Sequence, residues 1–513
     1  MESGPTQAVL PLVGLAAEKV IRDQYILERD NSTLRRHPLT SMSPTFWLII
    51  KEPTMLRLSC LLAVSFFLSG PLVAAAADYY VDPKRGDPDN DGSADKPWRS
   101  LQEVFDQGLV ESRDWSSFPY ENDSELAAKN PGAPVKAGDT IWLRGGDYGD
   151  VRILGYYNSD FITLAACEGH TPRFHSVRLR SGSRWILKGL HVSPEFGDGK
   201  RPRTMIDLES HGWRGPVRDV VVEDCVVRSA EDTSKWSVQQ WNARSCSGIE
   251  ADGTRITVRR NRLKNVDFGI TVGASHSLVE QNLVENFAGD GLRGLGNHIV
   301  FEDNVVKNCY DVNDNHDDGF QSWSRSEQGV GAGEVVGIIL RGNTIINYED
   351  RDQPHRGALQ GIGCFDGMYV DWVIENNVVV VDHYHGITLG GARGCRVVNN
   401  TVIDPNDRRP GPAAVRVGKH KNGTPSTGCT VRNNLTTALH AQSGRDMTVD
   451  HNLIVEDRAA IFVDPANRDF RLKAGSPAID AGCQDRAPDV DIRGVSRPQG
   501  QGVDIGAYEY SAE

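Results

Sequence analysis

An all-β fold, a single-stranded parallel β-helix, is predicted by three observations. A short unit recurs between about residues 219 and 455, and it consists of an apolar strand, an asparagine and a second apolar strand. The short repeats cluster near 21 to 23 residues, which is too few for a strand–helix–strand crossover. The apolar residues alternate with a period of two and show no helical periodicity. Such a unit buries its apolar face only by stacking on copies of itself.

The N-terminal part is predicted to precede the fold. Residues 55–77 combine Arg57, an apolar run from Leu58 and small residues up to Ala77, which is the pattern of a secretory signal peptide. Because such a peptide is read at the N-terminus, we expect Met55 to be the true initiator and residues 1–54 to come from a misassigned start. The protein is then secreted, or held at the cell surface or in the periplasm. The alternative, a membrane anchor behind a cytoplasmic tail, is disfavoured because the run is short and is interrupted at Pro71.

Composition limits the partners. The chain of 513 residues carries 56 Lys and Arg against 69 Asp and Glu, a formal net charge of -13. This balance disfavours a nucleic-acid binder and a binder of anionic membranes, because both need a basic surface. We expect no nucleic-acid partner, no membrane span and a monomeric protein. An acidic substrate stays compatible, since a basic cleft or a bound cation can reverse the charge locally.

The domain boundaries follow from the repeat. Residues 78–134 are predicted to form an N-terminal cap, in which residues 100–109 show apolar side chains at helical spacing. Residues 135–465 are predicted to form the β-helix. Residues 466–513 are rich in Gly and Pro and are predicted to form an irregular C-terminal cap. Both ends of a stack need such covers.

The asparagines are expected to form a row along one turn of the stack. Successive coils would lie about 4.8 Å apart, so each amide can hydrogen-bond to its neighbours above and below. Residues five and three positions before each asparagine share parity and point into the core. Cys395 and Cys429 occupy equivalent core positions, as buried free thiols by default or alternatively as a disulfide. The row comprises Asp224, Asn261, Asn282, Asn304, Asn343, Asn377, Asn400, Asn434 and Asn452.

A third strand precedes each unit and usually begins with glycine. One side chain of each such strand faces the core, and the next one faces outward. An outward polar row of this kind, with steps of about 4.8 Å, suits a linear polymer. The predicted row is Glu250, Thr271, Arg293, Gln321, Gln360, Thr388 and Arg416.

The asparagine row with its flanking strands resembles the right-handed parallel β-helix proteins of the pectate-lyase-like superfamily, over about residues 135–465. The segments YYVDPKRGDPDNDGS and RLKAGSPAIDAG also look like the leader and the end segment of secreted bacterial members. The resemblance implies a right-handed helix with a polysaccharide groove on the strand before the first turn. It does not fix the activity, because the superfamily holds lyases, hydrolases, epimerases and non-catalytic proteins.

The densest candidate site lies in residues 311–321. Asp290 and Asp318 each precede the glycine of a groove strand, so they should lie one coil apart. Carboxylates that close repel, so one takes a proton or a cation lies between them. An Asp-Gly pair alone is ordinary turn chemistry, but its neighbours favour a function. The candidate catalytic residues are Arg293, His316, Asp318 and His385; the substrate-binding candidates are Glu250, Gln321, Gln360, Arg416 and Lys419; the metal candidates are Asp290, Asp317 and Asp318.

Two mechanisms and one non-catalytic role fit these residues. In a lyase or C5 epimerase acting on a uronate polysaccharide, Ca²⁺ or Arg293 neutralises the carboxylate, and His316 or His385 removes the C5 proton. In an inverting glycoside hydrolase, Asp290 with Asp317 or Asp318 acts as acid and base. The third possibility is a surface β-helix that binds glycan without turnover. The lyase or epimerase is preferred.

A second calcium site is predicted at Asp87, Asp89 and Asp91, whose D-x-D-x-D-G spacing supplies hard oxygen ligands. The acidic residue expected at the twelfth position of such a loop is replaced by Trp98. The alternative is a solvated acidic turn.

Overall fold

The structure, a computed structural model, describes residues 76–406, 408–441 and 446–511. All of them belong to the unit Val73–Glu513, and the other unit, Met1–Leu72, lies outside the described residues. The predicted misassigned start 1–54 and nearly all of the predicted signal peptide 55–77 also lie outside them and stay predictions. In the part of the chain that is described, no helix has the length and apolar character needed to cross a membrane.

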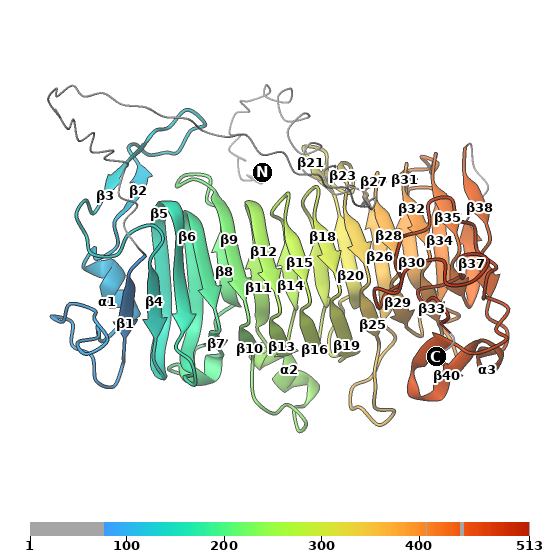
Figure 1. The fold of residues 1–513 in the computed structure, drawn as a ribbon, viewed down its shortest axis with the longest axis horizontal. Helices are drawn as coiled ribbons and strands as arrows, with labels where there is room; N and C mark the ends of the chain where they lie inside the picture. Colours follow the sequence, from blue (N-terminus) through green and yellow to red (C-terminus); the bar gives the residue numbers. More distant parts are fainter. Residues whose placement is uncertain (1–75, 407, 442–445, 512–513) are drawn as a thin grey trace, which may run out of the picture. The chain divides into compact units, whose positions relative to one another are not determined.

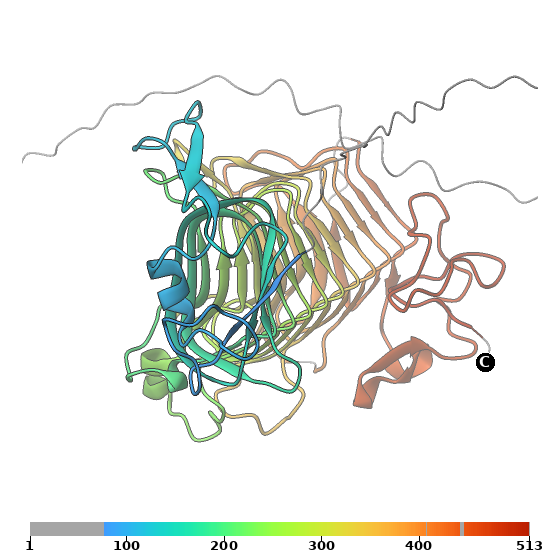
Figure 2. The ribbon, with the colours of Figure 1, turned by 60° about the vertical axis from the view of Figure 1, so that its left-hand side comes forward.

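The described chain winds into a parallel β-helix whose coils stack along one axis (Figure 1). Each complete coil places one strand on each of three faces, and each strand pairs in parallel with the equivalent strand of the next coil (Figure 2). Alternate side chains point inward, and one continuous apolar core fills the coils. Trp185, Phe301, Phe320 and Trp372 are among its largest fully buried members. The predicted fold class is confirmed.

Most strands of the three faces are short, because each strand ends at a tight turn. The first face, which carries the predicted groove, contains β8 Thr204–Glu209, β11 Ser247–Ala251, β14 Ile270–Val272, β17 Leu292–Gly294, β20 Asp318–Trp323, β26 Gln360–Asp366, β30 His385–Gly390, β34 Ala414–Gly418 and β37 Ala438–Ala441. The second face contains β9 Val217–Glu223, β12 Thr254–Arg259, β15 Leu278–Glu280, β18 Val300–Glu302, β24 Ile339–Arg341, β28 Val373–Glu375, β32 Arg396–Val398, β35 Thr430–Arg432 and β38 Thr448–Asp450. The third face contains β7 His191–Val192, β10 Val226–Arg228, β13 Arg262–Val266, β16 Leu283–Phe287, β19 Val305–Cys309, β25 Thr344–Ile346, β29 Val378–Val380, β33 Thr401–Ile403, β36 Leu435–Thr436 and β39 Leu453–Ile454.

The N-terminal end begins with β1 Asp78–Val81, which pairs with β4 Thr140–Leu143 and so belongs to the main sheet. The long strands β5 Gly146–Ala166 and β6 Pro172–Lys188 complete the first coils. Helix α1 Leu101–Asp106 lies within the predicted helical segment and buries Leu101, Val104 and Phe105 in the core. An antiparallel hairpin, β2 Ser112–Trp115 with β3 Leu126–Lys129, projects beside it (Figure 1).

Elements outside the coils come from the longer turns. They are α2 Val238–Arg244, the hairpin β21 Arg325–Ser326 with β22 Gly329–Val330, and a small parallel sheet of β23 Glu334–Val336, β27 Met368–Val370 and β31 Ala392–Arg393. The C-terminal segment contributes α3 Arg458–Ile461, β40 Phe462–Asp464 and β41 Asp469–Leu472.

The predicted asparagine row is a continuous hydrogen-bonded ladder at the turn between the second and third faces. Each side-chain Nδ2 donates to Oδ1 of the next asparagine at 2.8 to 3.0 Å, from Asn261 through to Asn452. The prediction that Asp224 starts the row is wrong, because Cys225 occupies that register position and its N–H donates to Asn261 Oδ1. Asp224 lies one residue earlier, in a left-handed turn position. The eight described cysteines are free thiols, and Cys395 and Cys429 are buried next to each other, which fits the default interpretation.

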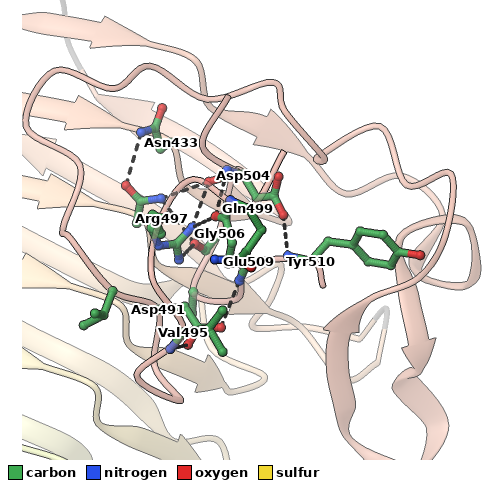
Figure 3. Close-up of polar contacts among 12 residues, drawn as sticks. Asn433, Asp491, Val495, Arg497, Gln499, Asp504, Gly506, Glu509 and Tyr510 are labelled. Carbon is green, nitrogen blue, oxygen red and sulfur yellow. Dashed lines mark hydrogen bonds and ion pairs between the residues drawn. The ribbon is translucent and has the colours of Figure 1, made fainter. Parts of the chain in front are cut away.

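The C-terminal segment folds back onto the outside of the third face. Leu435 and outward side chains such as Val378 and Ile403 pack there against Phe470 and Ile505. A buried ion pair fixes the end of this segment: Arg497 Nη1 lies 2.8 Å from Glu509 Oε2, and both side chains are almost fully buried (Figure 3). Arg497 Nη2 also donates to Asn376 Oδ1 of the β-helix at 3.2 Å. The tail is therefore an integral cover of one face.

Candidate functional site

The first face presents the predicted outward row. Paired strands place Asp207, Glu250, Thr271, Arg293, Gln321, Gly363, Thr388, Arg416 and His440 at one register position. The placement of Gln360 in this row is wrong: Gly363 occupies the position, and Gln360 is paired with Asp318. The strand begins three residues later than predicted, because the long turn before β26 hid its start.

A second row of side chains lies three residues before the outward row in each strand, and these side chains contact those of the outward row. Arg293 Nε donates to Asp290 Oδ2 at 2.5 Å, Gln321 Nε2 donates to Asp318 Oδ2 at 2.9 Å, and His385 Nδ1 lies 2.9 Å from Thr388 Oγ1. The sequence analysis missed this pairing. Its signal is the repeated order polar–Gly–apolar–polar, seen at Asp290 to Arg293 and at His385 to Thr388.

Asp290 and Asp318 form a buried carboxyl pair in neighbouring coils. Both side chains are at most 1% exposed, and the Asp318 N–H donates to Asp290 Oδ1 at 3.0 Å. Burial raises the pKa of Asp290 to about 6, although Arg293 opposes the rise. Burial, together with the charge of Asp290, raises the pKa of Asp318 well above its usual value. Asp318 Oδ1 has no hydrogen-bond partner among the described residues.

Gly363 is required beside this pair. A Cβ atom at Gly363 would lie 1.9 Å from Asp318 Oδ1, so only glycine leaves room for the carboxyl group. The gap in the outward row therefore seats the side chain of Asp318.

Asp317 is a third buried carboxyl group. It is 6% exposed and contacts the Cys309 thiol at the end of β19. Burial raises the pKa of Asp317 to about 8; the hydrogen bond from Cys309 opposes the rise, and the charge of Asp311 adds to it. Its Oδ1 atom has no partner in the described part of the chain.

The histidines form an aromatic cluster on the same face, two coils beyond Asp318. The ring centroids of His385 lie 5.1 Å from His383 and 4.5 Å from Phe365. Burial lowers the pKa of His383 to about 4, with the charge of His316 adding to the effect. Burial and the charges of His383 and Arg416 lower the pKa of His385 to about 3. Both rings are therefore neutral at physiological pH.

Asp318, Gln360 and His385 occupy one register position in β20, β26 and β30, because each precedes by two residues the paired core residues Phe320, Ile362 and Ile387. Two coil steps of about 4.8 Å separate the Asp318 and His385 backbones, roughly 10 Å in all. The carboxyl group of raised pKa and the imidazole of lowered pKa thus share one face.

Aromatic side chains flank these groups. The Arg293 guanidinium lies 3.7 Å from the Phe268 ring centroid and 5.3 Å from that of Trp323. Trp323 and Phe365 follow the outward row by two residues, so they share its side of the sheet. The sequence analysis missed both, although their parity could have shown them. Flat aromatic surfaces of this kind suit the apolar faces of sugar rings.

The remaining candidates lie in other coils or in the flanking loops. Glu250 lies three coils away and pairs with Arg203 at 3.6 Å. Arg416 lies over the Tyr384 ring, whereas Lys419 follows β34 and is exposed. His316 is exposed, and its charge reaches His383.

The predicted calcium ligands do not converge. Asp290 is engaged by Arg293, and Asp317 contacts Cys309. In the N-terminal loop, Asp87 Oδ1 accepts the Asp89 N–H and Asp91 Oδ1 accepts the Ser93 N–H, both at 3.0 Å, which is turn capping. Throughout residues 76–406, 408–441 and 446–511, no group of three or more His, Cys, Asp or Glu side chains is arranged to hold a metal ion. Calcium binding stays a prediction.

Comparison with known proteins agrees with this architecture. A family model described as a right-handed beta helix region matches residues 247–424. The chain is a right-handed parallel β-helix. The structure of XylC in complex with xylose is similar at 10% identity and a TM-score of 0.49, covering 84% of this chain and 98% of that one.

Two further solved structures are similar to this β-helix. The pectate lyase Pel9A shows 16% identity and a TM-score of 0.39, covering 85% of this chain and 97% of its own. The A-module of the mannuronan C-5 epimerase AlgE6 from Azotobacter vinelandii shows 16% identity and a TM-score of 0.39, covering 62% and 91%. No curated protein matches the sequence.

Proposed function

We propose that this β-helix is an exported polysaccharide-active enzyme, a lyase or C5 epimerase that transfers protons on a uronate-containing polysaccharide. The observation that carries the proposal is the pair of opposite pKa shifts on one face: burial raises the pKa of Asp318 and lowers the pKa of His385. Groups whose pKa values are pushed apart in this way mark the acid and the base of a site.

The chemistry follows from these two shifts. In the tautomer whose Nδ1–H donates to Thr388 Oγ1, the Nε2 atom of His385 is left to accept the C5 proton of a uronate. In elimination, the electron pair of the C5–H bond forms the C4–C5 double bond as the C4–O bond breaks, and Asp318 gives its proton to the leaving oxygen. In epimerisation the C4–O bond stays intact, and the C5 carbanion left by proton removal takes the proton of Asp318 from the opposite side. Arg293 supplies positive charge for the uronate carboxylate.

The test is incubation of the full chain with alginate, pectate and glycosaminoglycans while absorbance is followed in the unsaturated-uronate band. Lyase activity raises the absorbance, and epimerase activity changes the uronate composition without it. His385→Gln should abolish either activity, whereas Asn122→Gln, a change at an exposed turn outside the cluster, should not. A wild-type protein with no turnover on any polymer, but with retained binding, would support a non-catalytic glycan-binding role instead.

Hydrolysis is the second candidate, supported by the proton that Asp317 holds up to about pH 8. A general acid of this kind is what a glycosidase needs. However, the backbones of Asp290 and Asp318 lie one coil apart, about 4.8 Å, whereas an inverting reaction needs roughly 6.5–9.5 Å between its two carboxyl groups. Both oxygens of Asp290 are also engaged. Reducing ends that appear without the unsaturated-uronate absorbance would favour hydrolysis.

Export is part of the proposal, because a polysaccharide of this kind lies outside the cell. N-terminal sequencing of the mature protein is its test, and a start near Asp78 is the expected result.

A further inference from the structure

A cavity of about 820 Å³ lies at the N-terminal end, at the corner between the second and third faces. The turns that form the cavity follow β1, β4 and β5. After the last two of these turns, the start of β5 pairs with the start of β6, which pairs in turn with β7 of the third face. The cavity is therefore on a different corner from the groove of the first face. Its lining includes Lys84, Arg85, Arg144, His170, Thr171 and Arg173.

The cavity carries surplus positive charge in a chain whose net charge is -13. Arg144 lies 3.5 Å from Asp82, and Arg173 donates to both carboxylate oxygens of Asp147, so these two arginines are balanced. Within the described residues, neither Lys84 nor Arg85 forms an ion pair, and both side chains are exposed. Two positive charges are thus left facing the cavity.

The turn that carries Lys84 and Arg85 is fixed. Asp82 Oδ1 accepts the N–H groups of Lys84 and Arg85 at 2.9 and 3.2 Å. Gly86 closes the turn against the backbone of Trp98, where an added Cβ atom would lie 2.2 Å from the carbonyl oxygen. The two cationic side chains therefore start from a defined backbone, which lowers the entropy lost when they bind a ligand.

His170 adds a neutral donor with a defined tautomer. The Gly145 N–H donates to His170 Nδ1 at 2.9 Å, so that nitrogen is an acceptor and the ring proton is on Nε2. The ring is exposed at the edge of the cavity, so its Nε2–H is free to donate to a ligand oxygen. Lysine, arginine and a histidine N–H together form a donor set for an oxyanion.

We propose that this cavity binds a tetrahedral oxyanion, a phosphate or sulfate group, through the side chains of Lys84, Arg85 and His170. The group could be a free ion or an ester on a polymer, and the two sources share the same contacts. The proposal does not depend on turnover in the groove.

The test is isothermal titration of the full chain with inorganic phosphate and, separately, with inorganic sulfate at low salt and pH 7. We expect saturable binding of one ion per chain, weakened at least tenfold by the double variant Lys84→Ala/Arg85→Ala. The matched control is Arg113→Ala/Lys235→Ala, which removes two exposed positive charges elsewhere and should change the affinity less than twofold. The groove variant His385→Gln should bind as the wild type does.

A sulfated glycosaminoglycan and its desulfated form distinguish the sources. If the sulfated polymer binds more tightly than free sulfate, and this binding is lost in Lys84→Ala/Arg85→Ala, the ligand is the ester. If the sulfated polymer and free sulfate bind equally, the ligand is the free ion. The proposal is overturned if wild type shows no saturable binding of phosphate or sulfate. It is also overturned if both double variants lose affinity equally, because the binding would then reflect net charge alone.

Discussion

The buried ion pair between Arg497 and Glu509 allows a sharp test of how the tail is held. Arg497→Met removes the contact with Glu509 and three more hydrogen bonds, to Asp504 O, Gly506 O and Asn376 Oδ1. Since Glu509 is 1% exposed, its carboxylate is left in the interior without a counter-charge. Breaking a buried pair in this way destabilises a protein by about 3–5 kcal/mol.

A second substitution reveals the sign of the effect. Glu509→Gln alone should destabilise, because it leaves the Arg497 charge uncompensated. Added to Arg497→Met, it should restore about 1–3 kcal/mol, because it removes the orphaned charge and keeps an oxygen for the N–H groups of Gln499 or Asp504. A substitution that is harmful alone thus becomes stabilising in the second background.

The assay is urea unfolding followed by circular dichroism, combined with limited proteolysis of the tail. The control is Arg393→Met, which breaks an exposed ion pair of the same 2.8 Å length to Glu334 and should change the unfolding free energy by less than about 1 kcal/mol. Equal unfolding midpoints for Arg497→Met and Arg393→Met would refute the reasoning.

Four further predictions follow from the ladder and the site. Asn343→Ala removes hydrogen bonds to Asn304, Phe301 and Asn377 and should destabilise by about 3–6 kcal/mol in urea unfolding, whereas an equal midpoint to wild type would contradict the ladder's role. Because the pKa of Asp317 is raised from 3.8 to about 8, its stabilising contribution is complete below about pH 4 and is lost as pH rises through 8. Asp317→Asn should therefore be more stable than wild type at pH 9, by up to about 5 kcal/mol, and a melting series from pH 4 to 9 checks the sign. Turnover should need neutral His385 and protonated Asp318, so its rate should fall on the acid side near pH 3 and again as pH rises through the raised pKa of Asp318, and a rate that only rises with pH would exclude Asp318 as the acid. Chelator should lower the melting temperature only if the loop of Asp87 holds Ca²⁺, so an unchanged melting temperature argues against that site.

Sequence periodicity was enough to predict the stack, because apolar alternation and the hydrogen-bonding needs of an asparagine are local properties. The errors arose where one residue of register decides the outcome. Asp224 was placed in the ladder although Cys225 takes that position, since an acidic residue in a left-handed turn looks like a ladder residue in sequence. Gln360 was shifted because the long preceding turn obscures the first residue of β26.

The closeness of Asp290 and Asp318 was predictable from the sequence, but the shifts of their pKa values were not. Their one-coil separation follows from the glycine after each of them. The depth of burial, the space above Gly363 and the fold-back onto Arg293 and Gln321 depend on side-chain directions that spacing does not encode.

The ladder also limits how this site can be altered. Each coil must present its asparagine amide to the next coil, so segments can be gained or lost only as whole coils. The distance between Asp318 and His385 therefore changes in steps of one coil. Deleting the coil that carries Gln360 would place Asp318 and His385 in adjacent coils, whereas a shorter deletion would expose the apolar core. The length of sugar chain that fits between Asp318 and His385 can therefore change only in steps of one coil.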